Sequence, residues 1–188
     1  MANKGKTNQK LTQLLLDLKS ESESKVAAAI IDLASYGDET IVPELIQVLK
    51  INTSERIQKQ LAKLLADIQV SAAAAFFVQE IRKEENTDIL HLVLPILWES
   101  KLDFSAYFAD FVEISLSGDY LIALDCLTIL ENMPGPFSEN QLLEAQLHLK
   151  EFIEIKGELE ERKAQILSEI AVFVKDQNEG VDADLLFE

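Results

Sequence analysis

The sequence has little that would interrupt a helix or cross-link the chain. Its 188 residues include six Gly and four Pro, both of which break helices, and one cysteine, Cys126. A single cysteine cannot form an internal disulfide or a cysteine-based zinc site, and its apolar helical position favours a buried side chain. No run of about 20 apolar residues is present, so the sequence predicts no transmembrane helix.

Basic residues are also scarce. The chain has 17 Lys and Arg against 33 Asp and Glu, which gives a formal net charge of −16. The imbalance is local, because residues 131–188 hold 14 acidic and five basic residues, whereas residues 1–25 hold five Lys and three acids. An acidic surface repels nucleic-acid phosphates and anionic membranes. We therefore expect neither as a partner, and solubility explains the charge more simply than recruitment of a basic partner does.

The remaining composition favours an all-helical globular protein. Apolar residues make up 48% of the chain, and Leu, Ala, Ile, Glu and Lys dominate. The length suits one domain with its own core. Polar residues interrupt the segment 11–18, which makes it a poor signal-peptide core. These features predict a protein of the reducing cytoplasm.

One helix-length pattern recurs between residues 26 and 133. Val26, Ile57, Ile89 and Ile122 occupy the same place in four copies, at spacings of 31, 32 and 33 residues. A period in this range is the signature of a helical solenoid, in which each repeat buries its apolar side against its neighbours. The third copy is apolar almost throughout and would also suit a buried strand, but its alignment with the other copies favours a helix.

Helical spacing and capping residues predict ten helices. They are expected at 9–19, 25–36, 41–50, 56–68, 72–83, 89–98, 103 or 105 to 114, 121 to the break at 133–136, 142–156 and 159–174. Pro95 lies inside the sixth helix and should kink or open its backbone. Ser138 and Gln141 form a capping box before the ninth helix.

We expect these helices to form one helical-repeat domain at 9–176. It would contain the repeats at 9–133 and a pair of C-terminal capping helices at 137–176. Residues 1–8 and the acidic tail 177–188 are expected to be flexible. The last helix should turn polar residues such as Arg162 and Lys163 outward, because a stacked array needs a polar outer face at its end.

A family resemblance is carried best by residues 33–49. They contain Leu33 at the end of a helix, then a Gly-Asp turn, then a helix that includes Pro43 and Leu45. This pattern resembles the HEAT-repeat family, including its short bacterial members, over about residues 8–133. The resemblance implies an all-α, right-handed α–α superhelix of about four helix pairs, which the C-terminal capping pair would close. In this family the second helices line a concave side that commonly binds other proteins.

The motifs of common catalytic sites are missing from the sequence. Carboxylate pairs at helical spacing, such as Asp110 and Glu113, arise by chance on acidic helices. His91 and His148 are the two histidines, and a metal site would have to recruit carboxylates around one of them. Gly-rich phosphate loops, nucleophile elbows and metalloprotease motifs are not found. We therefore predict no catalytic, cofactor-binding or metal-binding residues and no enzymatic activity.

Three columns remain on the second helices once the core columns are assigned. They are Ala29, Gln60, Leu92 and Asp125; Asp32, Lys63, Pro95 and Thr128; and Ser35, Ala66, Trp98 and Glu131. In the third repeat they form an apolar patch among mostly polar neighbours, and tryptophan is a common binding anchor. We expect a partner-binding groove at Lys63, Leu92, Pro95, Trp98 and Asp125. Alternatively, the C-terminal helices cover the patch, since exposed apolar surface must be managed.

The function that the sequence favours is a non-enzymatic scaffold for a protein or peptide, with a basic partner among the options. The alternative is a structural subunit of a larger complex or a homodimer. A third hypothesis is an enzyme on a HEAT-like scaffold, such as a base-excision glycosylase. The acidic surface disfavours that class, because it needs a basic side toward nucleic acid. We expect no cofactor.

Overall fold

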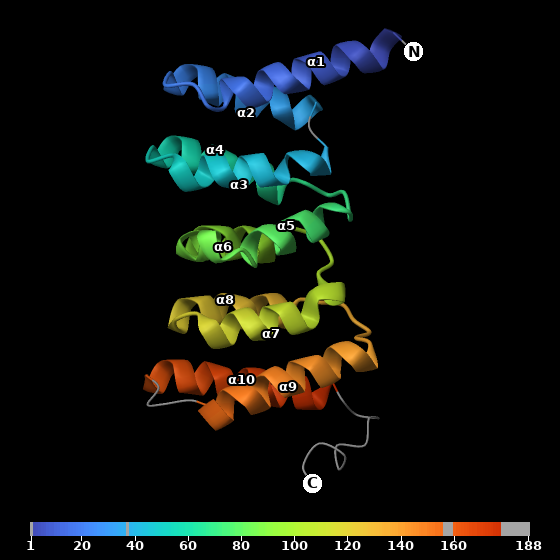
Figure 1. The fold of residues 1–188 in the computed structure, drawn as a ribbon, viewed down its shortest axis with the longest axis vertical. Helices are drawn as coiled ribbons and strands as arrows, with labels where there is room; N and C mark the ends of the chain where they lie inside the picture. Colours follow the sequence, from blue (N-terminus) through green and yellow to red (C-terminus); the bar gives the residue numbers. More distant parts are fainter. Residues whose placement is uncertain (1, 37, 156–159, 178–188) are drawn as a thin grey trace. The chain divides into compact units, whose positions relative to one another are not determined.

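The protein is all-α in the computed structural model, which describes residues 2–36, 38–155 and 160–177 (Figure 1). Within these ranges it forms ten α-helices and three short 3₁₀ helices, and no strand. None of the helices there is both long enough and apolar enough to cross a membrane. The chain groups into two compact units, 1–102 and 103–188, and our expectation of one repeat domain at 9–176 stays a prediction. We describe each unit separately.

The helices follow the predicted order, with small shifts at their ends. Unit 1 (residues 1–102) contains α1 (Ala2–Asp17), α2 (Glu23–Tyr36), α3 (Val42–Ile51), α4 (Glu55–Ala66), α5 (Ala73–Ile81) and α6 (Leu90–Glu99). Unit 2 (residues 103–188) contains α7 (Phe108–Ser117), α8 (Tyr120–Glu131), α9 (Glu139–Ile155) and α10 (Glu161–Asp176). Helix α1 begins at Ala2, inside the segment 1–8 that we expected to be flexible.

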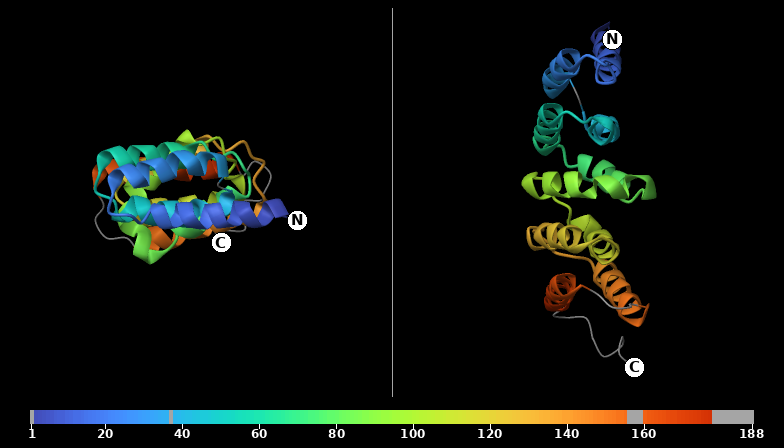
Figure 2. Two further views of the ribbon diagram at one scale, coloured as in Figure 1. Left: turned by 90° about the horizontal axis from the view of Figure 1, so that it is seen from above. Right: turned by 90° about the vertical axis from the view of Figure 1, so that its left-hand side faces the viewer.

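Unit 1 arranges its helices in two rows. Helices α2, α4 and α6 pack against one another in succession, and α3 packs against α5. In the right-hand view of Figure 2, α2, α4 and α6 lie on one side of unit 1 and α1, α3 and α5 lie on the other. Across the rows, α1 packs against α2 and α3 packs against α4. The second helix of each pair therefore has a neighbour in its own row, and this row carries the candidate site.

The apolar columns that recur in the sequence form the buried core. Val26, Ile57 and Ile89 are all buried in unit 1, and Ile122 is buried at the equivalent place in unit 2. Successive positions on the same side of each helix, such as Leu61 in α4, are buried as well. The predicted core side of the second helices is thus confirmed, because the burial has the same period as the sequence pattern.

In unit 2 the long C-terminal helices pack on the helix pair before them. Helix α9 packs against α7, and α10 packs against α8 and α9. The ring of Phe108 lies 4.3 Å from that of Phe137, between centroids. The predicted capping box is confirmed: the main-chain N–H of Ser138 donates to the Gln141 carboxamide at 3.0 Å, and the Gln141 N–H donates to the Ser138 hydroxyl at 3.3 Å.

We predicted that Lys163 faces outward, but its side chain is half-buried. Its Nζ donates to the main-chain carbonyl of Leu116 at 2.8 Å and lies 5.6 Å from the centre of the Phe152 ring. A cation is favoured near the end of α7 because the last carbonyls of a helix lack intrahelical donors. Burial lowers the pKa of Lys163, and the charge of Asp119 opposes this change. The neighbouring Arg162 is exposed, as expected.

The expected chain breaks have different outcomes. Helix α6 continues through Pro95, although proline has no N–H to donate to the carbonyl four residues before it. The segment between α5 and α6 contains a 3₁₀ helix, Glu84–Ile89, in which the buried Asn86 donates to the Glu80 carbonyl at 2.9 Å. Gly37 of the Gly-Asp turn and the acidic tail from 178 onward lie outside the described residues.

Burial in α4 predicts a large difference between two leucines of unit 1. Leu65 is 0% exposed and Leu16 is 60% exposed. Leu65→Ala should lower the free energy of unfolding by about 2–5 kcal/mol, because it leaves a cavity in the core. Leu16→Ala should stay within about 0.5 kcal/mol, as surface changes do. Urea unfolding followed by circular dichroism measures both, and equal losses would contradict the assigned helix sides.

The contact between Lys163 and Leu116 predicts a second difference, in unit 2. Lys163→Met keeps the aliphatic stem but removes the donor to a buried carbonyl, so the free energy of unfolding should fall by about 1–2 kcal/mol. Arg162→Met is the matched control on an exposed neighbour and should change stability by less than about 0.5 kcal/mol. Denaturant unfolding of both variants measures the difference. Equal stabilities would mean that the bond to Leu116 contributes nothing.

Candidate functional site

The structure places four of the five predicted site residues on two neighbouring helices. Lys63 is exposed on α4, and α6 carries Leu92, Pro95 and Trp98. Leu92 and Trp98 are 40% and 41% exposed, and Pro95 is half-buried between them in the sequence. Asp125 is half-buried on α8, in unit 2, and is therefore described apart from the others.

The register of α6 explains why these side chains remain at the surface. Residues 92, 95 and 98 are three apart, which puts them on one side of the helix. On the opposite side of the helix, the side chains are buried in the core: Val93, Leu94, Ile96 and Leu97. Because almost every residue of α6 is apolar, the core cannot take them all, and Leu92 and Trp98 are left facing solvent.

The alternative, that the C-terminal helices cover this patch, stays a prediction, because those helices belong to unit 2, which is described separately. Helices α9 and α10 pack against α7 and α8, within their own unit. Trp98 keeps about two-fifths of its surface accessible. The patch formed by Leu92, Pro95 and Trp98, which we call the α6 patch, is therefore an exposed apolar surface of unit 1.

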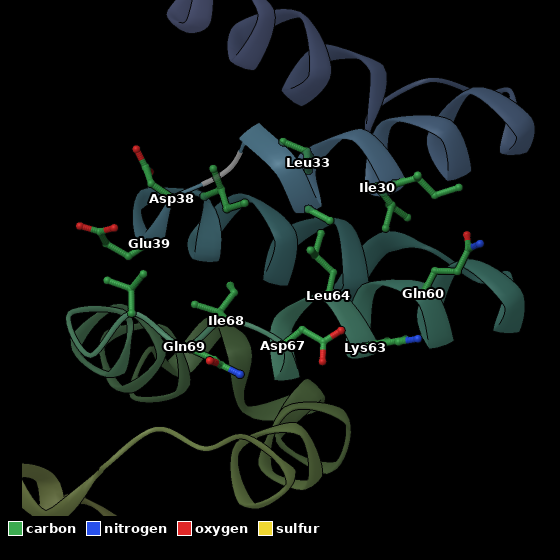
Figure 3. Close-up of a pocket in the computed structure, with 14 residues that line it drawn as sticks. Ile30, Leu33, Asp38, Glu39, Gln60, Lys63, Leu64, Asp67, Ile68 and Gln69 are labelled. Carbon is green, nitrogen blue, oxygen red and sulfur yellow. The ribbon is translucent and has the colours of Figure 1, made fainter.

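A groove that the sequence analysis did not single out lies between α2 and α4 (Figure 3). Its volume is about 560 Å³. Apolar side chains form its floor, including Ile30, Leu33, Leu64 and Ile68. Two exposed apolar residues, Ile31 and Val70, border it. We call this feature the α2–α4 groove; its size is that of a ligand cleft, which typically spans about 300–1,000 Å³.

The rim of the α2–α4 groove is mainly acidic. Asp38 and Glu39 lie together at one end, and Lys63 of α4 lies beside Asp67, the residue that follows α4 (Figure 3). Asp38 is held in place because its carboxylate accepts from the Thr40 N–H at 3.0 Å and caps a 3₁₀ turn. The rim thus carries three carboxylates and one ammonium group around an apolar floor.

A second, more polar depression adjoins the first, between α4 and the end of α6. It has a volume of about 410 Å³ and is lined by Lys59, Lys63 and Lys101, with Asp67, Gln69 and Glu99. Lys63, Asp67 and Gln69 line both depressions, which makes the surface continuous from α2 to the end of α6. We call this surface, together with the α6 patch, the binding face of unit 1.

The chemistry of the described side chains suits binding. No group of three or more His, Cys, Asp or Glu among residues 2–36, 38–155 and 160–177 could hold a metal ion. Cys126 is buried as predicted, and burial together with the charge of Asp125 raises the pKa of its thiol. A thiol in that environment stays protonated and shielded from solvent, so it is a poor nucleophile.

No model of a known protein family matches the chain, and searches of curated proteins and of solved structures find no match. The site must therefore be argued from its own residues. The sequence held one signal for the α2–α4 groove: Ile31 is an apolar residue beside Asp32, which belongs to a column left outside the core. The pairing of α2 with α4 and the course of residues 67–70 carry no such signal.

The exposure of Trp98 predicts its fluorescence directly, because it is the only tryptophan. The emission of the folded protein should be red-shifted relative to a buried indole and should be quenched by acrylamide. Urea should shift the emission only slightly further to the red, since two-fifths of the side chain is already accessible. Blue-shifted emission that acrylamide cannot quench would contradict the exposed α6 patch.

Proposed function

We propose that this protein is a non-enzymatic scaffold that binds a protein or peptide through the binding face of unit 1. The observation that carries the proposal is that Leu92 and Trp98, on the same side of α6, are both exposed. Exposed aromatic residues that border polar surface are frequent anchors at protein interfaces, where a few side chains supply most of the binding energy. Burying them in a complex would also remove apolar surface from water.

The repeat pattern supports a HEAT-like, right-handed superhelix as the architecture that presents this face. In such a solenoid the second helices line the concave side, and α2, α4 and α6 are the second helices of unit 1. The support is the matching burial of Val26, Ile57, Ile89 and Ile122 at spacings of 31 to 33 residues. A cytoplasmic location is part of the same proposal and rests on the single buried cysteine.

The charge distribution favours a basic partner. Residues 1–102 carry 12 Lys and Arg against 14 Asp and Glu, whereas residues 103–188 carry five against 19. A strongly acidic unit 2 would steer a basic partner toward the protein at long range. Recognition at short range would then fall to the apolar side chains of unit 1.

A structural subunit or homodimer is the second candidate function. It is favoured by large apolar side chains that are exposed on unit 2: Leu121, Leu147, Ile153 and Val172. Apolar residues spread over several helices suit a broad, permanent interface, such as the more hydrophobic interfaces of obligate assemblies. Sedimentation of the purified protein at increasing concentration separates the two functions, because a scaffold stays monomeric without its partner.

Affinity capture from native lysate tests the scaffold function. Trp98→Ala should abolish capture of a partner that the wild type retains, while the circular dichroism spectrum stays the same. Ile51→Ala is the matched control, because Ile51 is 69% exposed but lies at the end of α3, away from the binding face. A partner that binds equally to all three proteins would overturn the assignment to the α6 patch.

A further inference from the structure

The α2–α4 groove combines two features that together select a class of partner. Its floor is apolar and accepts hydrophobic side chains, and its borders include the exposed Ile31 and Val70. Its rim carries Asp38, Glu39 and Asp67, and the carboxylate of Asp67 makes no hydrogen bond or ion pair with the described part of the chain. An apolar floor without the acids would accept any hydrophobic segment. The carboxylates restrict the choice to segments that also carry positive charge.

We propose that the α2–α4 groove binds the apolar side of an amphipathic helix that carries Lys or Arg along its polar edges. The proposal rests on the proposed scaffold function and names the partner class at the same face. The apolar side chains of the helix would lie over Leu33, Leu64 and Ile68, and its basic side chains would reach the rim carboxylates.

A helix fits the groove better than an extended strand does. The walls are α2 and α4, whose main-chain groups are already hydrogen-bonded within each helix, and the described residues contain no strand edge to extend. An incoming segment must therefore satisfy its own main-chain hydrogen bonds while it buries apolar side chains. A helix does so, and about three turns of it, roughly 12 residues, would match the length of α4.

The rim charges are unevenly placed along the groove, and this placement determines where the partner's cations lie. Asp38 and Glu39 lie together at one end, whereas Lys63 stands beside Asp67 along the α4 side. Basic side chains are attracted most strongly to the end that carries the two carboxylates and lies away from Lys63. The preferred helix therefore carries its positive charges toward the end of the groove marked by Asp38 and Glu39 (Figure 3).

Three synthetic peptides test the partner class with the full-length protein. The first is a fluorescein-labelled amphipathic helix of about four turns built from Leu and Lys. In the second Glu replaces Lys, and in the third Ser replaces Leu. Fluorescence anisotropy should show binding of the first peptide, with an affinity about tenfold or more above those of the other two. Equal binding of the first and third peptides would overturn the proposal, since it would mean that charge alone suffices.

Variants of the protein then test the location. Asp67→Lys and Ile31→Glu should each weaken binding of the Leu-Lys peptide about tenfold, because one removes rim charge and the other puts a carboxylate at the apolar border. The matched controls are Glu144→Lys, the same charge change on exposed α9, and Ile51→Glu, at a comparably exposed isoleucine. Both controls should bind within about twofold of wild type.

The pattern of effects also separates this proposal from the scaffold function. If Glu144→Lys weakens binding as much as Asp67→Lys does, the peptide responds to net charge and the groove proposal fails. If a captured partner depends on Trp98 but not on Ile31 or Asp67, the scaffold function stands and the groove proposal fails. Circular dichroism of every variant confirms that the fold is intact, so that lost binding reports the surface change.

Discussion

Burial of one repeated apolar column in successive helices is the constraint on which the structure depends. Val26, Ile57 and Ile89 lie in the interior because each helix pair has neighbours that cover them. A helix pair of this length could not bury enough surface alone, so neighbouring pairs stabilise one another. The same constraint leaves side chains such as Lys63, Leu92 and Trp98 on α4 and α6 outside the core, and the binding face combines them with the apolar floor of the α2–α4 groove.

The binding face carries side chains that folding does not require. Asp38 helps to begin a 3₁₀ turn, but the side chains of Lys63 and Asp67 make no hydrogen bond or ion pair within the described residues. Trp98 places only part of its ring against the protein. The exposure of apolar residues such as Trp98 and Ile31 is most simply explained if the surface of a partner covers them for part of the time.

Charge and apolar contact are divided between different parts of the chain. The excess of acid lies in residues 103–188, and the groove and the α6 patch lie in residues 1–102. Long-range electrostatics mainly raises association rates, whereas buried apolar anchors mainly slow dissociation. A basic, amphipathic partner would use both, and salt should then act on its association rate more than on its dissociation rate.

Most of the fold could be predicted from the sequence, because it depends on patterns of residues that are close together in the chain. The ten helices, the buried columns and the Ser138–Gln141 capping box each depend on residues within a few turns of one another. The α6 patch was found because the repeat alignment marks which side of the helix is spare. Features that join distant segments were missed: the α2–α4 groove needs residues 67–70 beside α2, and Lys163 reaches the carbonyl of Leu116.

Hydroxyl-radical footprinting of the protein with and without its captured partner tests the central claim most directly, because it reports the accessibility of individual side chains. In the free protein Ile31, Leu92 and Trp98 should all be oxidised readily. In the complex the account predicts that these three are protected, while Leu121 and Leu147 of unit 2 are oxidised as before. Protection of Leu121 and Leu147, with Ile31 and Trp98 unchanged, would contradict the binding face.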